Sequence, residues 1–137
     1  MSNKQANPHA SAASAYGQNA LKHTPDQREM EGRVLLKAAQ KFLDLQADWA
    51  NVSPENLDDA LTYNRQIWMM FVDTALEDKN PERSNDLRSN IANLGSFIFK
   101  HSIETLADPR REKLNILIEI NREIAAGLMT KPKGEQT

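Results

Sequence analysis

The same two-residue signal, a capping residue followed by proline, occurs three times along this chain. It stands at Thr24-Pro25, Ser53-Pro54 and Asp108-Pro109. A Thr, Ser or Asp side chain accepts a hydrogen bond from a free backbone N–H at a helix start, and proline suits the first helical position because its missing N–H would be unpaired there. Apolar residues at spacings of three and four follow each signal, as in a helix that buries one face. The sequence therefore predicts three helix starts.

A fourth helix is predicted between the second and third signals, with Ser84 or Asn85 as its cap. The apolar stripes of the four helices comprise, in chain order, Met30, Val34, Ala38, Phe42, Leu45 and Trp49; Leu57, Ala60, Leu61, Ile67, Trp68, Phe71, Val72 and Ala75; Leu87, Ile91, Leu94 and Ile98; and Leu114, Leu117, Ile118, Ile124, Ala125 and Leu128. No segment shows the apolar–polar alternation of a half-buried strand. We therefore expect an all-α fold, an antiparallel bundle of four long helices of roughly 20–25 residues. Gly95, within the third helix, is expected to allow a close helix crossing.

The bundle is expected to occupy residues 24–129, followed by a tail at 130–137. Residues 1–23 are rich in Ala, Ser, Asn and Gln, and beyond Met1 their only large hydrophobic side chains are Tyr16 and Leu21. Such a segment cannot bury enough apolar surface to fold alone. We expect a flexible N-terminal arm that is loose in isolation or forms a short helix against the bundle or a partner.

Three asparagines lie within the apolar stripes. At about 100° per residue, Asn64 and Asn121 fall at the centres of the second and fourth stripes, and Asn90 joins the third. A buried amide without a partner costs on the order of 1–3 kcal/mol. We therefore interpret Asn64, Asn90 and Asn121 as a structural polar network that fixes the register of the helices. A polar ligand site and a misjudged helix phase are the alternatives.

The sequence offers little for catalysis or for holding a cofactor. Amides act neither as general acids nor as general bases. The three histidines, His9, His23 and His101, are scattered without the spacing of metal ligands, and the chain has no cysteine and no glycine-rich phosphate loop. We expect a protein that is not an enzyme, with no catalytic residues, no metal site and no cofactor.

Charge and hydropathy argue against two classes of partner. The longest run of large apolar residues, 67–72, is far shorter than the ~20 residues that cross a bilayer, and the N-terminus lacks the apolar stretch of a signal peptide. Between Ser53 and Asp78, six acidic residues accompany a single basic one, Arg65. Because basic residues form no stripe, phosphate binding is disfavoured. We expect a cytoplasmic protein that contacts neither membrane nor nucleic acid directly.

Two helices contain more apolar residues than one buried face requires. Met69 and Met70 point about 120–140° away from Asn64, to opposite sides. In the third helix a second apolar band lies away from Leu94. Either a further packed element such as the arm buries these groups, or they form a docking surface for an amphipathic helix. The candidate partner-binding residues are Tyr16, Tyr63, Met69, Met70, Phe99, Ile103 and Leu106.

Four sequence blocks carry a resemblance to a known family. They are LLKAAQKF (35–42), LDDALTYNRQIWMMF (57–71), LRSNIANLGSFIFKHSIETL (87–106) and KLNILIEINREIAAGL (113–128). In order and spacing they resemble the flagellar biosynthesis regulator FlaF of alphaproteobacteria, over roughly residues 15–128.

The resemblance implies a small, non-enzymatic cytoplasmic protein required for flagellin synthesis and export. Its implied partners are flagellin, for which it would be a secretion-chaperone-like partner, and the flagellin regulator FlbT. A translational regulator of flagellin acting through FlbT and a generic helical-bundle adaptor remain the alternatives. The resemblance brings no set of binding residues with it.

Overall fold

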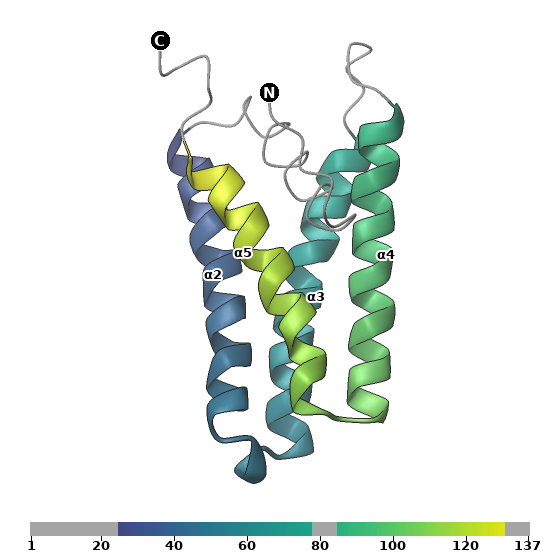
Figure 1. Ribbon diagram of the computed structural model, residues 1–137. Helices are drawn as coiled ribbons and strands as arrows, with labels where there is room; N and C mark the ends of the chain where they lie inside the picture. The colour runs from purple at the N-terminus through teal and green to yellow at the C-terminus, as the bar shows by residue number, and fades with distance from the viewer. Residues whose placement is uncertain (1–24, 78–84, 131–137) are drawn as a thin grey trace.

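The structure, a computed structural model, describes residues 25–77 and 85–130 (Figure 1). Its four long elements are α2 (Pro25–Ala47), α3 (Pro54–Glu77), α4 (Asn85–Ala107) and α5 (Asn115–Met129), and two 3-10 turns are η2 (Trp49–Asn51) and η3 (Arg111–Leu114). The described ranges contain no strand. The predicted all-α bundle of four helices is confirmed. The arm expected at 1–23 and the tail beyond Thr130 lie outside the described residues.

The second helix starts as its sequence predicts. Pro54 is the first residue of α3, and the Ser53 hydroxyl accepts a hydrogen bond of 3.0 Å from the backbone N–H of Asn56. This bond satisfies one of the free amides at the helix start. Pro25 likewise opens α2. Asn85 is the first residue of α4 rather than its cap, and the other candidate, Ser84, is not described.

The predicted start of the fourth helix is wrong. Arg110 is extended (φ −139°, ψ 138°), the turn η3 follows, and α5 begins only at Asn115. The Asp108 carboxylate accepts hydrogen bonds from Lys113 Nζ at 3.2 Å and from Arg110 Nε at 3.1 Å. The hydrogen bond from Lys113 and the charge of Arg110 lower the pKa of this carboxyl. Asp108 therefore closes a tight turn instead of capping a helix, and α5 has only 15 residues.

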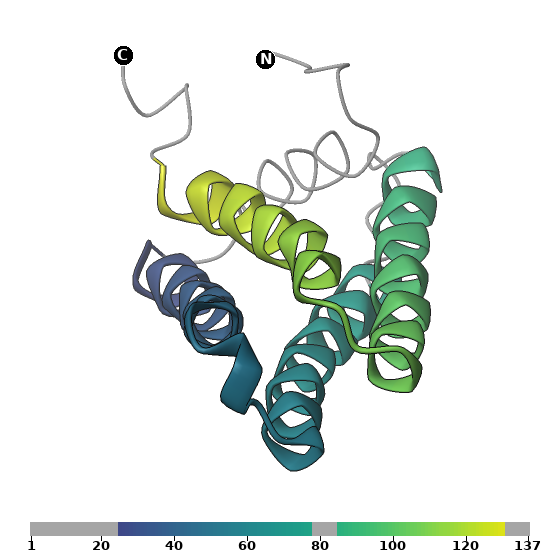
Figure 2. The same cartoon turned by 60° about the horizontal axis from the view of Figure 1, so that its bottom comes forward.

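The helices alternate in direction and are arranged as two antiparallel pairs. α2 packs along α5, and α3 packs along α4. Both views show α5, in yellow, starting beside the end of α4 and inclining away from it until it finishes beside the start of α2 (Figures 1 and 2). The two pairs therefore lie closest together at the end of the bundle that carries η2 and η3.

One core joins the two pairs. Each of the four helices contributes a side chain with no exposed surface, namely Phe42, Trp68, Ile98 and Leu117. Trp68 meets Phe71 edge to face, with ring centroids 5.6 Å apart. Burying a side chain of this size contributes roughly 1.5–3 kcal/mol, so the core supplies most of the stabilisation.

Polar bonds close both ends of the α2/α5 pair. Arg28, only 4% exposed, donates through Nε to the Leu128 carbonyl at 3.2 Å and through Nη2 to the Thr130 carbonyl at 2.7 Å. The guanidinium thus lies at the negative end of the α5 dipole and pairs its free carbonyls. At the opposite end, Gln46 Nε2 donates to the Arg111 carbonyl at 2.9 Å, and Arg111 Nε donates back to the Gln46 carbonyl at 3.0 Å.

Candidate partner-binding surface

Two Asn-Arg dipeptides lie in the middle of α3 and α5, and each asparagine points into the core. Asn64 and Asn121 are 0% and 1% exposed. Asn121 Nδ2 donates to Asn64 Oδ1 at 2.7 Å, and Trp68 Nε1 donates to Asn121 Oδ1 at 3.0 Å. Because this chain of bonds runs from α3 to α5, it joins the two helix pairs at one level and opposes a shift in their register.

Asn90 is not part of this network, which corrects the sequence prediction. It is exposed near the start of α4. It is seven residues before Phe97 and therefore lies on the side of α4 where His101 contacts η3. At this level α5 has already inclined toward α2 (Figures 1 and 2). The third member of the network is the Trp68 indole instead, which the positions of the asparagines alone did not predict.

The candidate partner-binding residues fall on two different sides of α3. Tyr63 is half-buried, and the ammonium groups of Lys37 and Lys41 lie 5.7 and 5.0 Å from its ring centre. Its ring therefore belongs to the contact between α2 and α3. Met70 is 69% exposed on this same side of α3. Tyr16 lies outside the described residues.

The remaining four candidates come together on the outer side of the α3/α4 pair. Two adjoining hollows of about 290 and 480 Å³ open there, and Arg65 and Ile103 line both of them. We call this surface the α3/α4 groove; its lining includes Leu61, Arg65, Met69, Phe99, Ile103 and Leu106. Along α3 it extends from Asp58 to Met69, which is about three helical turns or roughly 16 Å.

A glycine sets the spacing of the two helices just beyond the Met69 and Phe99 end of the groove. A Cβ built on Gly95 would collide with Cγ2 of Val72. The absence of a side chain at Gly95 therefore lets α3 and α4 approach closely, as expected from the sequence. The groove-lining residues follow on the outer edges of both helices, at helical spacings of three and four.

Arg65 is the main polar group between the two hollows. It is half-buried, and its Nη2 donates to the Thr62 hydroxyl at 3.0 Å. Within residues 25–77 and 85–130, no carboxylate forms an ion pair with it. A guanidinium has five N–H donors, so most of those on Arg65 remain available to solvent or to a bound molecule.

Other polar side chains also line the hollows: Asp58 and Ser102 line the first, and Thr62 and Gln66 line the second. Asp58 Oδ1 accepts a hydrogen bond from the Thr62 hydroxyl at 3.5 Å. Ser102 Oγ donates to the Ile98 carbonyl at 2.6 Å. His101 lies on the opposite side of α4, where a ring nitrogen lies 2.6 Å from the Lys113 carbonyl and the ring stacks on Phe97. In the described part of the chain, no group of three or more His, Asp or Glu could hold a metal ion. The groove thus presents apolar contact surface with the Arg65 guanidinium between its two hollows and the Asp58 carboxylate in the lining of the first.

Neither described range includes a helix long and apolar enough to pass through a bilayer. In comparisons with known proteins, the family described as flagellar protein FlaF matches residues 12–128. That match includes all of α2, α3 and α4 and nearly all of α5. No curated protein and no solved structure matches the chain.

Proposed function

The chain belongs to the FlaF family of flagellar proteins, and on this premise we propose that it is a non-enzymatic partner of flagellin. In this role it binds an amphipathic helix of flagellin before export. Covering the apolar face of that helix prevents flagellin from associating with itself too early.

The exposed apolar groups of the α3/α4 groove are the observation that supports this proposal. Met69 is 55% exposed, Ile103 is 62% exposed and Leu106 is 40% exposed. Clustered apolar groups of this size on a protein surface commonly mark an interaction site. Burying them against a partner is worth roughly 25 cal/mol per Å² of apolar surface. A methionine at the edge adapts its shape to the partner's side chains.

The shape of the groove favours a helix as the bound element. It is formed by two packed helices, and an amphipathic helix places side chains at i, i+3, i+4 and i+7 into a surface of this kind. Its length of about three turns limits the contact to a short segment. Binding of that extent is compatible with release when flagellin is exported.

The distribution of charge favours a protein partner over RNA. Arg65 is the single basic residue of α3, which also contains five acidic ones. A nucleic acid backbone would be repelled by this helix. Regulation of flagellin synthesis through FlbT would also act by protein contact, and purified FlbT can replace flagellin in the experiment below.

Gel filtration of the purified protein with purified flagellin tests the proposal. We expect the two to co-elute, and we expect Met69→Asp to abolish the complex because it places a charge in the groove. Met30→Asp is the matched control, because Met30 is 65% exposed on α2, in the other helix pair. Both variants should keep the helical circular dichroism of the parent. Failure of the parent protein to bind flagellin at any ratio would overturn the proposal.

A further inference from the structure

We propose that the helix bound by the α3/α4 groove carries an acidic side chain in the middle of its apolar face, and that Arg65 pairs with this acid. The inference rests on the proposed function and adds to it the chemistry of the segment that is recognised. It assigns Arg65 as a specificity-determining residue.

The position of Arg65 is the first argument. It lines both hollows, with Leu61 and Leu106 on one side and Met69 and Phe99 on the other. A helix lying along the groove must therefore pass over the guanidinium between its two apolar contacts.

The spacing on α3 defines the pattern of the partner. Leu61 and Met69 are eight residues apart, which corresponds to roughly 12 Å along the axis. Apolar side chains about two turns apart on the partner, at i and i+7, would enter the two hollows. The residue at i+3 or i+4 then faces Arg65.

Desolvation is the second argument. Arg65 is already half-buried, and docking a helix over it removes much of its remaining water. Its one recorded hydrogen bond, to the Thr62 hydroxyl, leaves most of its N–H donors without a partner in the described residues. Covering these donors with an apolar side chain is costly, whereas a carboxylate accepts two of them side by side. The groove therefore disfavours a helix with a uniformly apolar face.

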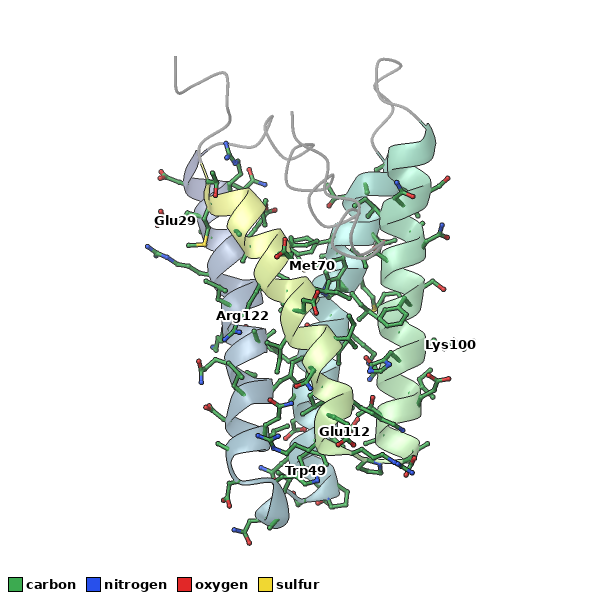
Figure 3. All side chains as sticks on the ribbon, in the orientation of Figure 1. Glu29, Trp49, Met70, Lys100, Glu112 and Arg122 are labelled. Atoms are coloured by element: carbon green, nitrogen blue, oxygen red, sulfur yellow. The ribbon has the colours of Figure 1, made fainter. Side chains whose placement is uncertain are left out.

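The second Asn-Arg dipeptide provides a matched comparison. Arg122 also follows a buried, hydrogen-bonded asparagine, but it is exposed on α5. Figure 3 shows Arg122 on the side of α5 turned toward α2, and Lys100 on the outer side of α4. Arg122 lines neither hollow of the groove. Replacing it changes net charge by the same amount as replacing Arg65 and leaves the groove intact.

The test uses synthetic helical peptides of about 15 residues with Leu at i and i+7. Three peptides differ only at i+4, which is Glu, Gln or Lys. Affinities for the full-length protein are measured by fluorescence anisotropy, and the contact is mapped by amide chemical shifts of the labelled protein. We expect the Glu peptide to bind about tenfold more tightly than the Lys peptide, with a preference that declines as salt is added.

Variants at Arg65 test whether this residue causes the preference for the Glu peptide over the Lys peptide. Arg65→Gln should remove the preference for Glu over Lys, and Arg65→Glu should reverse it. A reversal cannot come from loss of folding, since the variant must still bind one peptide well. Arg122→Gln should retain the preference of the parent.

The inference is overturned if the parent binds the Glu and Lys peptides equally, if the preference survives in Arg65→Gln, or if no peptide shifts the amide signals of the groove. The gel-filtration result is separate. A flagellin complex that is unaffected by Arg65→Glu would leave the proposed function standing while the inference fails. An Arg65-dependent peptide preference without a flagellin complex would support the groove chemistry and contradict flagellin as the partner.

Discussion

The two residues of the Asn64-Arg65 dipeptide have different structural roles. Asn64 points to Asn121 in the core, whereas its neighbour Arg65 lies on the outer groove. The two directions follow from a rotation of about 100° per residue. Because Asn121 both donates to Asn64 and accepts from Trp68, it holds the central position in the polar contact between α3 and α5.

The two core asparagines should differ in what their replacement costs. Asn121→Leu leaves both the Trp68 indole N–H and the Asn64 oxygen without partners. Asn64→Leu leaves only Asn121 Nδ2 unpaired and removes Asn64 Nδ2, which is itself buried without a partner among the described residues. We expect Asn121→Leu to lower the free energy of unfolding by about 1–3 kcal/mol more than Asn64→Leu does. Urea denaturation measures both values.

Asn90→Leu is the control for this comparison. Asn90 is exposed, so its replacement should change the free energy of unfolding by no more than about 0.5 kcal/mol. A loss at Asn90 comparable to that at Asn121 would contradict the network of two amides and one indole.

At the scale of the elements, the sequence predicted helices well where local chemistry decides their limits. Ser53 and Pro54 start α3 as expected, because a cap needs only its own next three residues. Asp108 and Pro109 carry the same signal, yet Lys113 and Arg110 compete for the carboxylate and a turn forms instead. The direction of α5 was also beyond reach, since it depends on packing against α2. For this reason the exposure of Asn90 could not be foreseen.

Because α3 and α4 approach closely at Gly95, the effect of Gly95→Ala on stability should depend on the residue at position 72. Gly95→Ala in the parent should lower the free energy of unfolding by about 1–2 kcal/mol net, because a collision with Val72 outweighs the better helix propensity of alanine. In a Val72→Ala background the colliding Cγ2 atom is absent, and Gly95→Ala should raise the free energy of unfolding by about 1 kcal/mol. Thermal unfolding of the four proteins forms the cycle. The same sign in both backgrounds would show that Gly95 does not set the helix spacing.

At the scale of the whole molecule, the two helix pairs divide scaffold from binding surface. The α2/α5 pair is closed at both ends by Arg28 and by Gln46 with Arg111. The α3/α4 pair carries the groove on its outer side. The sequence placed Met69 and Met70 on opposite sides of the core face, but it did not decide which of the two sides forms one surface with the apolar band of α4. Only the packing of α2 against Tyr63 and of α4 beside Met69 does so.

This division predicts that stability and binding can be impaired independently. Arg28→Met removes a buried cation that pairs two carbonyls at the end of α5, and it should lower the free energy of unfolding by about 2–3 kcal/mol. At a temperature where the variant remains folded, its affinity for flagellin should equal that of the parent, because the groove lies on the other pair. Met69→Asp should do the reverse, since Met69 is exposed in the parent and its replacement leaves the core intact. If Arg28→Met weakened flagellin binding as strongly as Met69→Asp, the bundle would have to act as one unit, and the assignment of binding to the α3/α4 pair alone would fail.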